Sequence, residues 1–196
     1  MELFQLGGWM MWPLLAVSIA VLAIVIERGL LVLSCPFPDR DFAGRLLAAL
    51  KQGDLTPVAE AMAAVPLLKD FAATLGEASL ANQEAALRIA GEEALARLEA
   101  RLPLLSLLSR VAPLMGLLGT IQGMITTFSR IADSQSGVDM PLLAGGIWQA
   151  LITTATGLSI AIPALFCLHL FQGKARRVAA TLNEAGNAAL TLAGRI

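Results

Sequence analysis

Three long apolar runs dominate the pattern of hydrophobic and polar positions along the chain. The first covers about 12–26 and resumes at 29–33 after two charged residues, the second covers 111–129, and the third covers 142–171. A helix needs about 20 mostly apolar residues to cross a bilayer. The pattern therefore predicts three transmembrane helices, of which the third is long enough to tilt or to extend beyond the bilayer.

The stretch between the first two runs has the periodicity of shorter helices. Apolar residues recur at helical spacing over 42–50, and Gly53 is expected to end that helix. Thr56-Pro57 predicts an N-cap followed by proline at the first helical position. The stretch 83–102 is expected to continue into the second run as one long helix with a kink at Pro103. The predicted fold class is an all-α integral membrane protein, with three transmembrane helices extended by long cytoplasmic helices.

Composition and charge support this fold class and orient it. Hydrophobic residues make up 57% of the chain and charged residues 15%, whereas soluble domains carry nearer a quarter charged residues. The net charge of −1 does not indicate a nucleic-acid partner. Basic residues lie mainly between the first two runs and after the third, which places the N-terminus outside and the C-terminus inside. No Lys or Arg precedes Arg28, so the first run lacks the basic start of a cleavable signal peptide and is expected to remain as a span.

The expected division of the chain follows from the runs and the charges. The clearest turn outside the cytoplasmic part is expected at 133–137. The predicted segments are an extracytoplasmic N-terminus with the first transmembrane helix (1–34), a cytoplasmic helical domain (35–103), the second transmembrane helix (104–130), an extracytoplasmic loop (131–141), the third transmembrane helix (142–172) and a cytoplasmic C-terminal helix (173–196).

Few residues carry reactive chemistry. The chain has two cysteines, Cys35 and Cys167, and one histidine, His169, with no CxxC motif or Cys/His cluster. We therefore predict no disulfide, no metal site and no cofactor. A membrane-embedded enzyme is one alternative, but the sequence has no catalytic constellation near a span, so we expect no enzymatic activity.

Small residues form a stripe on each of the two later spans. Such stripes let helices approach closely in lipid, and Gly119 with Gly123 forms the GxxxG pattern of helix association. The stripe of the second span comprises Ala112, Gly116, Gly119, Thr120, Gly123 and Thr127. The stripe of the third span comprises Gly146, Ala150, Gly157, Ala161 and Ala164. We predict that these stripes pack helices together.

Threonine hydroxyls are the candidate functional groups within the spans. The ordinary interpretation of a membrane threonine is a hydrogen bond to its own helix backbone. Thr120 and Thr154 lie on or beside the stripes, where a hydroxyl can reach a neighbouring helix or a water-lined cavity. The deep parts of the spans contain no Asp, Glu, Lys or Arg. Glu27 and Arg110 lie near span ends, and their side chains are expected to extend to the interface. If protons cross, another chain must supply the carboxylate.

Two long motifs resemble those of the MotA/TolQ/ExbB proton-channel family. Residues 112–124 read APLMGLLGTIQGM and are similar to the family signature APLLGLLGTVxGM. Residues 146–158 read GIWQALITTATGL, followed by AIPA at 161–164, and are similar to the signature GIxEALxxTAxGLxxAIPA. The resemblance covers about 97–171 closely and the first span more loosely. It is strongest to the ExbB/TolQ-type biopolymer transport proteins.

The resemblance implies an assembly and a mechanism. Family members form a homopentamer around a pore, which holds a dimer of a single-span partner of the ExbD/TolR type. The partner helix carries an aspartate that takes up and releases protons, and the family threonines that face it correspond to Thr120 and Thr154. We also place Thr127, Thr153 and Gln149 among the residues expected to line the proton pathway or face the partner. The family often has Glu at Gln149, and a neutral amide there exchanges no proton.

The resemblance also implies a location and a task. It places the protein in a bacterial inner membrane, with its outer segments in the periplasm. The short cytoplasmic domain favours the ExbB/TolQ branch over flagellar stators. Our first hypothesis is an ExbB-like subunit acting with a TonB-like protein in TonB-dependent outer-membrane transport, and the second is a TolQ-like subunit acting with a TolA-like protein in envelope maintenance. A stand-alone ion channel or transporter and a passive assembly scaffold remain as alternatives.

Overall fold

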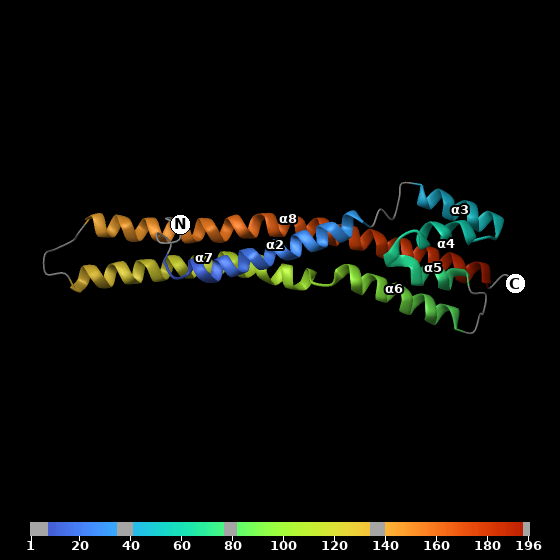
Figure 1. The fold of residues 1–196 in the computed structure, drawn as a ribbon, viewed down its shortest axis with the longest axis horizontal. Coiled ribbons are helices and arrows are strands. Elements are labelled where there is room, and N and C mark those ends of the chain that lie inside the picture. The colour runs from blue at the N-terminus through green and yellow to red at the C-terminus, as the bar shows by residue number, and fades with distance from the viewer. Residues whose placement is uncertain (1–7, 35–40, 77–81, 134–139, 194–196) are drawn as a thin grey trace. The chain divides into compact units, whose positions relative to one another are not determined.

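The computed structural model describes residues 8–34, 41–76, 82–133 and 140–193, most of which are helical, with no β-strand among them. Cys35 and most of the turn predicted at 133–137 lie outside the described residues. The helices, shown in Figure 1, are α2 (Met11–Leu33), α3 (Phe42–Gln52), α4 (Thr56–Ala63), the 3-10 helix η1 (Pro66–Leu68), α5 (Lys69–Gly76), α6 (Gln83–Glu99), α7 (Leu102–Asp133) and α8 (Met140–Ala193).

The three predicted spans are confirmed as helices that are long and apolar enough to cross a membrane. Mean hydropathy reaches 2.3 in Met11–Leu33, 1.7 in the stretch Gln83–Asp133 that contains α7, and 1.9 in Met140–Ala193. In the most apolar part of each helix, most residues are not buried by other residues of the chain. Such a surface is compatible with lipid, because lipid tails are as apolar as the side chains that face them.

The predicted single long helix from 83 through the second span is wrong, because the structure has two helices there. The stretch from Gln83 does not continue into the second span, because α6 ends at Glu99 and Ala100 is extended, with φ −49° and ψ 136°. Arg101 follows with a positive φ of 66°, and α7 begins at Leu102. In a continuous helix the ring of Pro103 would clash with the carbonyl four residues earlier. The break places Pro103 in the first turn of α7, where a missing N–H costs no hydrogen bond.

Two predicted helix boundaries are close to those observed. Gly53 ends α3 in the left-handed conformation, with φ 73°, and its N–H donates to the Ala49 carbonyl at 2.8 Å. Thr56 is the first residue of α4, so the N-cap is Leu55 and the prediction was one residue off. The carboxylate of Asp54 accepts hydrogen bonds from the Thr56 N–H at 2.9 Å and from its hydroxyl at 2.6 Å. These bonds hold the pKa of Asp54 below its ordinary value.

The chain divides into two compact units, each described here by itself. Unit 1 contains the described residues of Met1–Glu27 and Arg101–His169, and unit 2 contains those of Arg28–Ala100 and Leu170–Ile196. In unit 1 the parts of α2, α7 and α8 run side by side (Figure 1). Its buried side chains include Leu14, Leu105 and Ala112, none of which is accessible to solvent.

Unit 2 has a hydrophobic core of larger side chains. Val58, Met62, Leu68 and Val178 are fully buried there, and Phe71 is 3% exposed. Charged residues lie mostly on its surface, where Arg97 pairs with Glu93 at 2.6 Å and with Asp70 at 3.7 Å. Exposed pairs of this kind contribute little to stability, because solvent screens them. The core and its charged surface are those of an ordinary water-facing helical domain.

Candidate functional site

The candidate site lies in unit 1, where α7 and α8 pack at backbone distance. A methyl group at Gly157 of α8 would lie 2.6 Å from the Ala112 carbonyl oxygen of α7. A methyl group at Gly116 of α7 would lie 2.9 Å from the Thr153 carbonyl oxygen of α8. Any larger residue at either position would force the helices apart. We call this contact the α7–α8 seam.

The same seam continues along the two small-residue stripes. A methyl group at Gly119 would lie 3.0 Å from the Thr153 side chain, which is 1% exposed. Gly123 lies opposite Ala150, where a methyl group would make an ordinary contact at 3.7 Å. Further along, a methyl group at Gly146 of α8 would overlap the Thr127 side chain of α7. Ala161 is also buried, at 2% exposure.

Thr154 makes the hydrogen bond that crosses the seam. Its hydroxyl donates to the Gly116 carbonyl at 3.3 Å, from α8 to α7. In contrast, the Thr120 hydroxyl donates to Leu117 of its own helix at 2.7 Å. The same backbone bonding is seen for Thr126 with Gln122 (2.9 Å), Thr127 with Gly123 (2.8 Å), Thr153 with Ala150 (2.7 Å) and Thr156 with Ile152 (2.8 Å).

The structure does not bring Thr120 and Thr154 into contact through their hydroxyls. No hydrogen bond joins them among the described residues, and both side chains are partly buried. A hydroxyl that donates its proton to a carbonyl still has lone pairs that accept. It can also rotate to donate elsewhere. Each threonine can therefore bond a carboxyl group in either protonation state.

Neither span contributes a titratable acid or an amine to the seam. Between Arg110 and Arg130 on α7, and between Met140 and Lys174 on α8, the sequence has no Asp, Glu, Lys or Arg. His169 lies on α8, where its Nδ1 hydrogen bonds with the Leu165 carbonyl at 2.8 Å. Among the described residues, no group of three or more His, Cys, Asp or Glu is arranged to hold a metal ion. The chemistry available in the seam is therefore that of hydroxyls and backbone carbonyls.

Gln149 lies in a polar pocket near the start of α8. The pocket has a volume of about 480 Å³ and is lined by residues of 8–10, α7 and α8, including Gln122 and Arg130. A side chain at Gly8, whose φ is +71°, would collide with the Gln149 amide nitrogen, so the amide lies against that backbone. Sequence reasoning missed this pocket, because the contact between residues so distant in the chain has no local signal.

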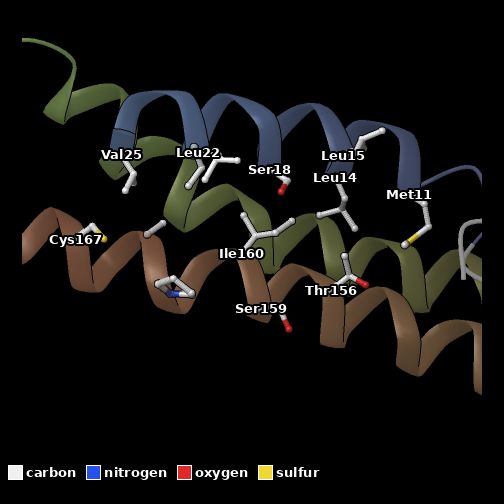
Figure 2. Close-up of a pocket in the computed structure, with 13 residues that line it drawn as sticks. Met11, Leu14, Leu15, Ser18, Leu22, Val25, Thr156, Ser159, Ile160 and Cys167 are labelled. Carbon is white, nitrogen blue, oxygen red and sulfur yellow. The ribbon is translucent and has the colours of Figure 1, made fainter. Parts of the chain in front are cut away.

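A second hollow in unit 1 is an apolar groove between α2 and α8 (Figure 2). Its volume is also about 480 Å³. Leu14, Leu22 and Ile160 contribute apolar walls, and Ser18 with Thr156 contributes hydroxyls. Cys167 lines the same groove as a free, partly buried thiol. The groove is lined mainly by hydrocarbon, which suits a membrane environment.

Charged residues meet at the end of α2 in unit 1. The carboxylate of Glu27 forms an ion pair with the guanidinium of Arg101, the residue with positive φ at the start of α7. In unit 2, Arg28 is 6% exposed and donates a hydrogen bond to the Arg97 carbonyl at 2.9 Å. The sequence predicted that Glu27 extends to the interface but did not predict either partner. Both partners are about 70 positions away in the chain, where residue spacing carries no signal.

Comparison with known proteins identifies relatives of this chain. The profile of the MotA/TolQ/ExbB proton channel family matches residues 58–184. The biopolymer transport protein ExbB-like 1 of Synechocystis is 31% identical over 174 residues, which cover 85% of this chain and 68% of that protein. The exbB1 biopolymer transport protein of Vibrio cholerae is 40% identical over 86 residues, which cover 44% of this chain and 38% of that protein.

A relative of the other branch is similar to the same degree. The Tol-Pal system protein TolQ of Pseudomonas aeruginosa is 37% identical over 89 residues, which cover 45% of this chain and 38% of that protein. The chain thus matches less than two fifths of the length of the Vibrio and Pseudomonas proteins. The similarity defines a family and is shared between its ExbB and TolQ members.

Proposed function

This chain belongs to the MotA/TolQ/ExbB proton channel family, and from that premise we propose that it is a pore-forming subunit of a proton-driven motor in a bacterial inner membrane. The proposed subunit is ExbB-like and couples the proton gradient to mechanical work in TonB-dependent outer-membrane transport. It assembles as a homopentamer around two copies of a single-span partner of the ExbD/TolR type. A TonB-like protein receives the work.

The proposed topology follows the basic residues. With the N-terminus outside, the residues of 35–103 and 173–196 are cytoplasmic, and those of 131–141 are periplasmic. Three apolar helices support a multi-pass membrane protein. Reactivity of single cysteines placed at Gln52 and at Asp133 with a membrane-impermeant thiol reagent would test the topology, in a Cys35→Ser, Cys167→Ser background. Labelling at position 133 in intact spheroplasts, with protection at position 52, is expected.

The observation that carries the mechanism is the hydroxyl of Thr154 on the seam. It bonds the Gly116 carbonyl at 3.3 Å, in spans without an acid or amine of their own. We propose that a carboxyl group from the partner helix approaches this region and exchanges a proton, while Thr154 and Thr120 bond its charged and neutral forms. Thr127, Thr153 and Gln149 are proposed to line the route. An imported carboxyl is required because a proton carrier inside a membrane needs a titratable group.

Threonine variants test this role directly. Thr154→Ala and Thr120→Ala should leave assembly with the partner intact and abolish proton-driven work, whereas Thr154→Ser should retain most of it because the hydroxyl remains. Thr156→Ala is the matched control, because Thr156 lies on the same helix but lines the apolar groove toward α2, where its hydroxyl bonds the Ile152 carbonyl. The measurement is proton flux and energy-dependent uptake in a strain lacking the native gene. Normal work by both alanine variants would overturn the relay.

The neutral side chain at Gln149 has its own test. Gln149→Glu places a carboxyl group in the polar pocket beside α8. A change in proton flux would support a place for this position on the route. Unchanged flux in the assembled complex would place it off the route.

A TolQ-like role in envelope maintenance is the second candidate, supported by the similarity to a TolQ protein at 37% identity. Deletion of the gene distinguishes the two, because loss of TonB-dependent outer-membrane uptake indicates the ExbB-like role, and loss of envelope integrity indicates the TolQ-like role. Native mass spectrometry, with and without the neighbouring single-span protein, tests the assembly. A pentamer that takes up partner copies supports the motor, whereas a chain that conducts ions alone in vesicles would indicate a stand-alone channel.

A further inference from the structure

The polar pocket beside Gln149 contains Arg130, to which the proposed motor assigns no role. It lies where the apolar run of α7 ends at Ser129 and close to the first turn of α8, because Arg130, Pro141 and Gly145 all line it. Arg130 is exposed, and its guanidinium makes no ion pair with any described acidic residue. No Asp or Glu is among the described residues that line the pocket. Within the described residues, the pocket is therefore a polar hollow in which no carboxylate pairs with Arg130.

Its remaining polar groups suit an anion with several oxygen atoms. Gln122 and Gln149 each have an amide NH₂ with two donors. The guanidinium of Arg130 has five donors in a planar fork, a shape that matches a phosphate better than a point charge does. Gly145 leaves part of the α8 wall without a side chain, and no other group of the described residues fills the space beside it, so a headgroup has room there. A volume of about 480 Å³ holds a headgroup of this kind.

The surroundings select a lipid over a soluble anion. Trp9 lines the pocket and is 59% exposed, and tryptophans of this kind lie at the depth of lipid headgroups. Exposed apolar side chains lie on both helices close to the pocket in sequence, namely Phe128 on α7 and Trp148 with Leu151 on α8. They provide a surface for acyl chains. A soluble anion would fill the pocket but would not contact these exposed apolar side chains.

We propose that this pocket binds the phosphate headgroup of a membrane phospholipid, with the guanidinium of Arg130 as the principal donor and the amides of Gln122 and Gln149 as secondary donors. The bound lipid would occupy the outer ends of α7 and α8 and the segment around Gly8. This site depends on the protein lying in a membrane, and it shares Gln149 and Thr127 with the proposed proton route.

The test is lipid binding to the purified full-length protein by native mass spectrometry in detergent. The probes are phosphatidylglycerol and a glucosyl diacylglycerol with the same acyl chains, which lacks the phosphate. Wild-type protein should retain the phospholipid about tenfold more tightly than the glycolipid, as expected for a charge-assisted hydrogen bond. Arg130→Gln should remove that preference, and Arg130→Lys should keep part of it. Circular dichroism and gel filtration confirm that each variant is folded.

Arg110→Gln is the matched control, because it removes an exposed arginine from the other end of the apolar run of α7, outside this pocket. It should bind the phospholipid as the wild type does. Equal loss in both variants, or no loss in Arg130→Gln, would overturn the proposal. Displacement of the lipid by millimolar inorganic phosphate would assign the pocket to a soluble anion, and a loss confined to binding of the single-span partner would assign it to a carboxylate of that protein. Either result would also overturn a lipid site.

Discussion

The two units of the chain bury their side chains in opposite ways. Unit 2 has a core of large side chains such as Met62, Phe71 and Val178, and most of its charged residues face outward. Unit 1 packs α7 against α8 through Gly116, Gly157 and their neighbours, and leaves large apolar residues exposed along the same helices. Unit 2 has large hydrophobic side chains inside, whereas the α7–α8 seam of unit 1 has small residues inside and large hydrophobic residues outside.

The difference reflects the solvent that each unit is built for. In water, burial of large apolar groups drives folding, at roughly 25 cal/mol per Å² of apolar surface removed. In lipid that driving force between helices is absent, so close van der Waals contact and interhelical hydrogen bonds take its place. The bond from Thr154 to Gly116 belongs to the second kind. Removal of a large buried side chain should therefore destabilise unit 2. Addition of a side chain to the α7–α8 seam should destabilise unit 1.

The largest expected effect is the loss of a core side chain in unit 2. Phe71 is 3% exposed, and its ring packs beside Gly91 of α6. Phe71→Ala should lower the free energy of unfolding of unit 2 by about 3–5 kcal/mol, because it removes buried area and leaves a cavity. Hydrogen–deuterium exchange should show faster exchange of the amides of 42–99 and unchanged protection in α7.

Leu47→Ala is the control for that prediction. Leu47 is 60% exposed on α3 of the same unit, so its removal should change stability by less than about 0.5 kcal/mol. If the two variants destabilise unit 2 equally, side-chain burial is not what stabilises it.

A smaller effect is expected from the addition of volume to the seam of unit 1. Gly157→Val places a side chain where even a methyl group would lie 2.6 Å from the Ala112 carbonyl oxygen. We expect a loss of about 3 kcal/mol, because backbone atoms cannot yield as a flexible side chain can. Thermal unfolding in detergent measures it. Gly145→Val is the matched control, because no atom lies within 4 Å of a methyl group there. Similar midpoints for the two variants would show that the seam is not closely packed.

The smallest expected effect is a pH-dependent one at the surface of unit 2. Hydrogen bonds from Thr56 lower the pKa of Asp54 in the folded protein. A lowered pKa adds stability above the pKa of the unfolded chain, near about 4 for Asp, and that stability is lost as pH falls through the folded value. The difference in unfolding midpoint between wild type and Asp54→Asn should therefore be present at pH 6 and shrink toward pH 3. A difference that grows at low pH would contradict this sign.

Much of the fold is local enough to be predicted from the sequence. The three apolar runs, the end of α3 at Gly53 and the positions of the small residues all depend on residue type and spacing. The break at Ala100–Arg101 was not predicted, because Pro103 allows either a kink or a new helix start. The ion pair between Glu27 and Arg101 and the burial of Arg28 were missed for a related reason, since each depends on a partner distant in the chain.

The sequence by itself determined which segments are helices, which of them suit lipid, and which hydroxyls lie near a helix contact. Periodicity and composition are sufficient for this, because they reflect backbone geometry and the affinity of side chains for lipid or water. Only the tertiary structure decided that Thr154 bonds across to Gly116 while Thr120 bonds its own helix. It likewise placed Arg130 and Gln149 around one pocket. Such choices depend on distances between separate helices, which residue spacing along one helix does not specify.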